Sequence, residues 1–146
     1  MIQIKAATWR PQKNGSALRW KQPMILILDG DDGVRDSLRF LLECAGFKSL
    51  EFASCREFLD VDRSGDGDCL ILDLHMPEMS GIELLEEMRR RGKALPAILI
   101  TGRLDATLGE RACAVGALAV VEKPYVAAEI LNLVREALGQ TKIPPV

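Results

Sequence analysis

The stretch CLILDLHMPEMSGIELLEEMRR, residues 69–90, decides the fold that this sequence predicts. It begins with the apolar run Cys69–Leu72, which is typical of a strand buried on both faces of a parallel sheet. A loop with Pro77 follows, and Ser80 then begins a helix with Glu83 at the capping-box spacing. One face of this helix carries the apolar residues Ile82, Leu85 and Met88. The stretch therefore predicts a strand, a loop and a helix in direct succession.

The same succession extends on both sides of this stretch. Four further strands are predicted, at Met24–Leu28, Lys48–Ala53, Ala97–Ile100 and Leu118–Val121. Four further helices are predicted, from Val34 to Ala45, from Ser54 to Leu59, from Asp105 to Val115 and from Ala127 to Leu138. Five strands that alternate with five helices predict an α/β fold, a doubly wound five-stranded parallel sheet with helices on both faces.

Charge divides the chain into two parts. Residues 1–22 contain five basic residues and no acidic residue, whereas the remainder contains 14 basic and 21 acidic residues. We predict an irregular basic extension at residues 1–22, one domain at 23–139 and a tail at 140–146. The acidic body argues against direct nucleic-acid binding, because the phosphate backbone favours clustered positive charge. The extension is interpreted as a loosely docked leader, with a basic arm for a partner as the alternative.

Composition excludes several other classes of protein. No apolar stretch approaches the roughly 18 residues needed to span a membrane, and the N-terminus lacks a signal-peptide core. We therefore expect a cytoplasmic protein without membrane contact. The four cysteines include no C-x-x-C pair, and the chain has a single histidine. This pattern favours small side chains in a reducing compartment over a zinc site.

The predicted central strands each stop at a polar or charged residue. Asp29 ends the first strand, Asp73 the third and Thr101 the fourth, and the fifth runs through Glu122 to Lys123. In doubly wound folds, ligands bind at the carboxyl ends of the strands, where the strand order reverses. Because all these residues fall at that edge, the sequence predicts a binding site there.

The residue types at this edge predict phosphoryl chemistry. If the first and third strands are neighbours, Asp29 and Asp73 approach each other. Asp31 and Asp32 are then close by. Clustered carboxylates either raise the pKa of one of them or recruit a cation, and hard oxygen ligands suit Mg²⁺. Lys123 can bind a phosphate oxygen and the Thr101 hydroxyl another, so a strand-end carboxylate can act as nucleophile and form an aspartyl phosphate. The alternative is that these aspartates are solvated turn formers.

Four segments, LILDGDDGVRDSLRFLLECAGF, LILDLHMPEMSGIELLEEMR, AILITG and ALAVVEKPY, resemble the CheY-like receiver domains of two-component response regulators. The resemblance runs from about residue 23 to residue 139. It implies the flavodoxin-like strand order 2-1-3-4-5 and a phosphoprotein whose acceptor is Asp73. It also implies that Lys123 contacts the phosphoryl group and that Thr101 hydrogen-bonds to it on switching. The domain would not be an enzyme beyond Mg²⁺-dependent self-phosphorylation and self-dephosphorylation.

The resemblance implies a Mg²⁺ site with one departure from the family pattern. Its ligands would be Asp29, Asp73 and the main-chain carbonyl of His75. The family usually has two consecutive acids at the end of the first strand, and the second is a direct metal ligand. Here Gly30 occupies that second position, so Asp31, or the aspartate after it, would have to replace the missing carboxylate. We expect Mg²⁺ binding to be weakened accordingly.

Other positions of the family pattern lead to further expectations. The bond Lys123–Pro124 is expected to be cis. His75 and Arg103, two residues after the acceptor and after the strand-end threonine, are expected to tune the lifetime of the phosphoryl group. An aromatic residue usually stands three positions before the lysine, and its ring moves with the threonine. This chain has Val120 there, and Tyr125 is not an obvious substitute, so a conventional aromatic switch is not expected.

Three functions follow from these observations. The first is a receiver that takes a phosphoryl group from a histidine kinase or phosphotransfer protein and docks to a downstream protein target or output domain. Its docking surface would be the fourth helix, fifth strand and fifth helix, with a homodimer as one outcome. The second, motivated by Gly30 and Val120, is an interaction or dimerisation module that needs no phosphorylation. The third, a flavodoxin-like enzyme or nucleotide binder, is disfavoured because the aspartates of the DGDDG turn repel phosphate.

Overall fold

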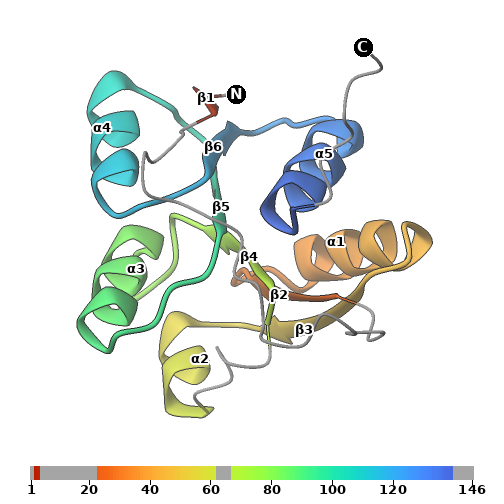
Figure 1. The fold of residues 1–146 in the computed structure, drawn as a ribbon, viewed down its shortest axis with the longest axis horizontal. Helices are drawn as coiled ribbons and strands as arrows, with labels where there is room; N and C mark the ends of the chain where they lie inside the picture. The colour runs from red at the N-terminus through yellow and green to blue at the C-terminus, as the bar shows by residue number, and fades with distance from the viewer. Residues whose placement is uncertain (1, 4–22, 62–66, 140–146) are drawn as a thin grey trace.

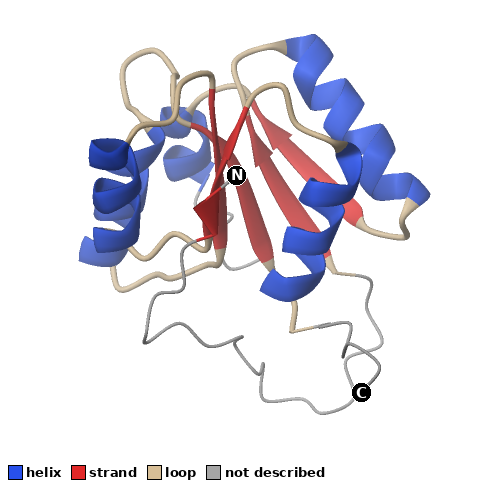
Figure 2. Ribbon diagram, turned by 90° about the horizontal axis from the view of Figure 1, so that it is seen from above, coloured by secondary structure: helices blue, strands red, loops and turns tan. Residues whose placement is uncertain are grey.

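The computed structural model describes residues 2–3, 23–61 and 67–139, in which a twisted sheet lies between two layers of helices (Figure 1 and Figure 2). The strands are β1 (Ile2–Gln3), β2 (Met24–Leu28), β3 (Lys48–Phe52), β4 (Cys69–Asp73), β5 (Ala97–Thr101) and β6 (Ala119–Glu122). Their order across the sheet is β1-β6-β5-β4-β2-β3. Strands β2 to β6 are parallel, which confirms the predicted parallel sheet and the order 2-1-3-4-5.

Strand β1 is an addition that the sequence analysis did not predict. It pairs antiparallel with β6, with Ile2 opposite Val120 and Gln3 opposite Ala119. Residues 1–22 were expected to be irregular, and residues 2–3 differ from that expectation. A two-residue strand is too short to produce a periodic apolar pattern, so its sequence carries no signal. The rest of the predicted extension, and the predicted tail at 140–146, lie outside the described residues.

The helices fall where the sequence predicts them. They are α1 (Asp32–Cys44), α2 (Cys55–Val61), α3 (Gly81–Arg90), α4 (Ala106–Ala114) and α5 (Ala127–Ala137). The predicted capping box is present, because the Ser80 hydroxyl accepts from the Glu83 N–H while the Glu83 carboxylate accepts from the Ser80 N–H. None of the helices in the described part of the chain is long and apolar enough to cross a membrane.

Alternating side chains of the strands divide the core into two layers. Helices α1 and α5 cover one face of the sheet, and α2, α3 and α4 cover the other (Figure 1). In β2, for example, Ile25 and Ile27 pack toward α1 and α5, whereas Leu26 and Leu28 pack toward the opposite layer. Each such side chain contributes roughly 1.5–3 kcal/mol when fully buried. The register of the central strands is therefore fixed, and so is the position of the polar residue that follows each apolar run.

Candidate functional site

Two carboxylates lie buried next to each other at the carboxyl edge of the sheet. Leu28 of β2 is opposite Leu72 of β4, so Asp29 and Asp73 are the next residues on neighbouring parallel strands. Asp29 is 3% exposed and Asp73 is 9% exposed. Two acids at so little exposure repel each other unless a cation or a proton compensates. The register thus confirms that the first and third predicted strands are neighbours.

The carboxylate of Asp29 is only half satisfied. Its Oδ1 accepts a hydrogen bond from the main-chain N–H of Asp31 at 2.9 Å. Its Oδ2 is buried and has no hydrogen-bond partner among the described residues. Burial raises the pKa of Asp29, and the charge of Asp73 raises it further, while the Asp31 N–H and the Lys123 ammonium act to lower it. The site therefore holds a buried carboxylate oxygen that accepts no hydrogen bond from the described residues.

The acceptor candidate Asp73 is joined to Thr101 through His75. The main-chain N–H of His75 donates to Asp73 Oδ1 at 3.1 Å. The imidazole Nε2 of the same residue lies 3.1 Å from the Thr101 hydroxyl. Thr101 is fully buried at the end of β5. Its hydroxyl also contacts both main-chain polar groups of Arg103, at 3.0 Å and 3.1 Å.

Lys123 follows β6 and reaches the same edge of the sheet. Its main-chain N–H donates to the Thr101 carbonyl at 2.8 Å, which fixes the two strand ends relative to each other. The ammonium group is close enough to lower the pKa of Asp29. The Lys123–Pro124 bond is cis, as predicted. Lys123 thus places a positive charge at the same edge as the two acids.

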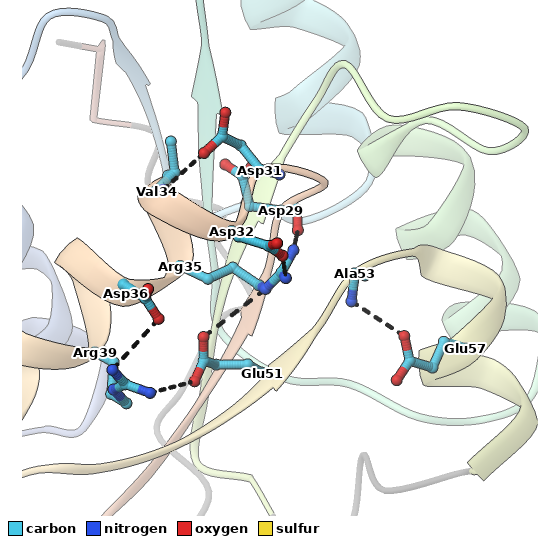
Figure 3. A network of polar contacts seen from close by, with 10 residues as sticks. All are labelled: Asp29, Asp31, Asp32, Val34, Arg35, Asp36, Arg39, Glu51, Ala53 and Glu57. Atoms are coloured by element: carbon cyan, nitrogen blue, oxygen red, sulfur yellow. Dashed lines mark hydrogen bonds and ion pairs between the residues drawn. The ribbon is translucent and has the colours of Figure 1, made fainter.

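The carboxylates of Asp31 and Asp32 each interact with a group on α1 (Figure 3). The Asp31 carboxylate is exposed and caps α1 by accepting from the Val34 N–H at 3.0 Å. Asp32 pairs with the guanidinium of Arg35. Within the described residues, no group of three or more His, Cys, Asp or Glu side chains is arranged to hold a metal ion. The structure therefore brings Asp29 and Asp73 together, while the Asp31 carboxylate serves as the α1 cap, although its charge still helps to raise the pKa of Asp29.

Arg35 is a residue of this site that the sequence analysis missed. Its Nη1 donates to the main-chain carbonyl of Asp29 at 2.6 Å, and its Nε lies 3.8 Å from Glu51 of β3 (Figure 3). The side chain is only 13% exposed. The spacing of Asp32 and Arg35 on α1 is a known pairing signal, but the contact with Glu51 depends on strand pairing. Arg35 thus ties the turn that carries Asp29 to the neighbouring strand.

Replacing Arg35 by glutamine is expected to lower the free energy of unfolding by about 1.5–3 kcal/mol, the contribution of a hydrogen bond to a charged group, here partly buried. Arg39 offers a matched control, since it also pairs with Glu51 but is 44% exposed. Its replacement by glutamine should change stability by less than about 0.5 kcal/mol. Urea unfolding of both variants measures the difference. Equal losses would show that the Asp29 contact is not the important one.

Two glycines define where side chains fit around the site. A Cβ at Gly30 would meet nothing closer than the Ala53 carbonyl, at 3.9 Å, so a larger side chain has room there. A Cβ at Gly81 would lie 3.0 Å from the side chain of Leu72 and 3.1 Å from the carbonyl of Asp73. Close packing of α3 against β4 therefore favours glycine after Ser80, because a Cβ there would force its neighbours to shift. The glycine after Asp29 is not required by packing.

The fold and this edge define a class of protein: a doubly wound α/β domain with an acidic site beside a lysine at the strand-order reversal. The sequence model of the response regulator receiver domain matches residues 25–135. The chain belongs to this family, the receiver domains of two-component response regulators.

Named relatives agree with this assignment. The chain is 40% identical over 115 residues to the transcriptional regulatory protein FixJ of Azorhizobium caulinodans. This alignment covers 79% of the chain and 54% of that protein. It is 39% identical over 116 residues to the response regulator protein TodT of Pseudomonas putida, covering 79% of the chain and 51% of that protein. The chain thus spans about half the length of the curated relatives that it matches.

Solved structures give the same fold. A structure titled FixJ-N aligns with a TM-score of 0.73 at 30% identity and covers 86% of this chain and 99% of that one. The chemotaxis protein CheY4 of Vibrio cholerae aligns with a TM-score of 0.74 at 25% identity, covering 81% of this chain and 100% of that one. These matches confirm the flavodoxin-like architecture.

Proposed function

We propose that this receiver domain accepts a phosphoryl group on Asp73 from a histidine kinase or phosphotransfer protein. The observation that carries the proposal is the buried pair of Asp29 and Asp73, in which one oxygen of Asp29 has no partner among the described residues while Lys123 lies at the same edge. Such a pair is costly unless a cation binds to it. It suits a site that binds a metal and a phosphoryl group.

The donor set fits Mg²⁺. Asp29 and Asp73 would supply carboxylate oxygens, and the main-chain carbonyl of His75 would supply a third hard oxygen, which is the ligand type that Mg²⁺ prefers. Asp31 would join the set if its carboxylate left the α1 cap. When bound, Mg²⁺ neutralises the acids and withdraws charge from the phosphoryl group. The unpartnered oxygen of Asp29 is the observation that supports this assignment.

Three side chains have separate roles in the proposed phosphoryl transfer. An oxygen of Asp73 forms the new O–P bond while the bond from phosphorus to the donor nitrogen or oxygen breaks, and the donor leaves with that electron pair. Lys123 balances charge on the phosphoryl oxygens, and the Thr101 hydroxyl donates a hydrogen bond to one of them. In self-dephosphorylation, a water oxygen would form the new bond to phosphorus while the Asp73 O–P bond breaks, which releases inorganic phosphate and returns the carboxylate. The domain thus acts as a signalling module, and not as an enzyme with its own substrate.

The output is proposed to be protein docking in the cytoplasm. The match to this chain covers only 54% of FixJ, and that relative is named a transcriptional regulatory protein. A downstream target or output domain that docks on α4, β6 and α5 suits a receiver, because β6 connects that surface to Lys123. The alternative is that a second copy of the domain docks on the same surface and forms a homodimer. Phosphorylation would shift an existing equilibrium between two conformations.

Intact-mass spectrometry after incubation with acetyl phosphate tests the proposal. We expect a phosphoryl adduct that needs Mg²⁺, that is absent in Asp73→Asn, and that forms at least tenfold more slowly in Lys123→Ala. Glu57→Gln is a matched control, because this exposed carboxylate accepts a hydrogen bond from the Ala53 N–H and lies apart from Asp29 in Figure 3. If well-folded protein forms no adduct at any Mg²⁺ concentration, the proposal is wrong and an interaction module independent of phosphorylation remains.

A further inference from the structure

The hydroxyl of Thr101 has no free hydrogen-bonding capacity. A hydroxyl has one hydrogen to donate and two lone pairs to accept with. The Thr101 hydrogen goes to the Arg103 carbonyl at 3.0 Å, and one lone pair accepts from the Arg103 N–H at 3.1 Å. The remaining lone pair faces the imidazole Nε2 of His75 at 3.1 Å. With the hydroxyl hydrogen assigned to the Arg103 carbonyl, we infer that His75 is the donor, through an Nε2–H group.

His75 connects the acceptor to this hydroxyl within one residue. Its main-chain N–H donates to Asp73, and its side chain donates to Thr101. The ring itself is exposed, whereas Thr101 is fully buried, so the ring lies over the hydroxyl from the solvent side. A phosphoryl group on Asp73 would therefore meet Thr101 on the same side as His75.

The position that precedes Lys123 by three residues has no movable ring in this chain. Val120 is fully buried in β6, between β5 and the short strand β1. A β-branched side chain in a packed sheet has a restricted χ1 angle and no large volume to exchange. Because no ring at this position can move with Thr101, we expect the direct partners of its hydroxyl, His75 and Arg103, to control its motion.

We propose that His75 is a positioning residue that competes with the phosphoryl group for the Thr101 hydroxyl. In the unphosphorylated domain the Nε2–H of His75 and the main chain of Arg103 hold the hydroxyl away from Asp73. Turning the hydroxyl to the phosphoryl group gives up these hydrogen bonds. The strength of the His75 contact thus sets how readily Thr101 reaches its phosphorylated position. This inference rests on the proposed function and adds a regulating group to the same site.

The unphosphorylated protein allows a direct test of the contact. His75 is the only histidine of the chain, so its ring nitrogens give unambiguous NMR signals. At a fixed pH where the ring is neutral, we expect the Nε2–H tautomer to predominate in the wild type. Thr101→Val keeps the shape of the side chain and removes the hydroxyl, and it should return the ring to a mixture of tautomers. An unchanged ring in Thr101→Val would overturn the contact.

A double-mutant cycle tests the competition. Beryllofluoride is the probe, as a tetrahedral substitute for the phosphoryl group, and its affinity is measured with Mg²⁺ present. His75→Ala should tighten binding by about threefold to tenfold, the effect of one net hydrogen bond. His75→Gln, which keeps an N–H donor, should bind like the wild type. In the Thr101→Val background, His75→Ala should have no effect, because the competition is gone.

Failure of this inference differs from failure of the proposed function. If the wild type binds beryllofluoride but His75→Ala has the same effect with and without the Thr101 hydroxyl, His75 acts in another way and the inference is wrong. If the wild type binds neither beryllofluoride nor a phosphoryl group, the proposed function is wrong, and the inference about His75 is wrong as well.

Discussion

Replacing Gly30 by aspartate is expected to tighten Mg²⁺ binding on the order of 10-fold to 100-fold. The new carboxylate would directly follow Asp29 at the edge of the sheet, where Asp31 is held at the α1 cap. A Cβ at Gly30 has no neighbour closer than 3.9 Å, and the backbone there is not in the left-handed region. The substitution should therefore add a ligand without straining the turn.

Isothermal titration calorimetry of Mg²⁺ binding measures this effect, and Gly30→Asn is the control. Asparagine has nearly the shape of aspartate but no charge, so it should bind Mg²⁺ within a few-fold of the wild type. The rate of adduct formation at limiting Mg²⁺ should rise in Gly30→Asp and not in the control. Equal affinities of the two variants would mean that the side chain at this position does not reach the ion.

Replacing Asp29 by asparagine is expected to stabilise the metal-free domain at neutral pH while removing most of its Mg²⁺ affinity. The wild-type carboxylate is buried with an unpartnered oxygen beside Asp73, and relief of such an arrangement is worth about 1–2 kcal/mol. For a chain of this size, that corresponds to an increase in Tm of roughly 2–8 °C. The gain in stability and the loss of Mg²⁺ affinity are both expected from replacing the same unpartnered carboxylate oxygen of Asp29.

The pH dependence of stability should distinguish this explanation from a change in packing. The folded state raises the pKa of Asp29 above its ordinary value of 3.8, so in the window between the two values the native state binds more protons than the unfolded state. The free energy of unfolding therefore falls as the pH rises through that window. Asp29→Asn lacks this fall, so its advantage should be full at neutral pH and shrink as the pH approaches the ordinary value.

Urea unfolding between pH 4 and pH 7.5, in the presence of a chelator, gives the measurement. Asp36→Asn is the matched control, because this carboxylate is on α1 but is 63% exposed and pairs only with Arg39 among the described residues. It should change stability by less than about 0.5 kcal/mol at any pH. A stabilisation of Asp29→Asn that did not vary with pH would contradict an electrostatic origin.

The elements that the sequence predicted well are those with a local cause. Apolar runs bounded by polar residues located the central strands, and the 3.6-residue period with capping residues located the helices. The acid pair could also be predicted, because a parallel sheet forces Asp29 and Asp73 to the same edge once their strands are neighbours. The cis bond before Pro124 came from the family resemblance and is present in the structure.

The features that escaped prediction depend on contacts between distant segments. Arg35 reads in the sequence as an ordinary exposed helix residue, and only the pairing of β2 with β3 brings Glu51 to it. The contact of His75 with Thr101 joins residues 26 positions apart on neighbouring strand ends. The use of Asp31 as a helix cap competes with its expected use as a ligand, and spacing alone does not decide between these uses.

Strand β1 has a consequence for how molecules of this domain meet at high concentration. Without it, β6 would be an outer strand with unpaired main-chain groups at Ala119 and Val120, and such a row is a template on which another chain can add a strand. With Ile2 and Gln3 in place, growth on that side of the sheet must first displace them. Two residues at the start of the chain thus act as protection against edge-to-edge aggregation, so a truncation that removes them should make the domain more prone to associate.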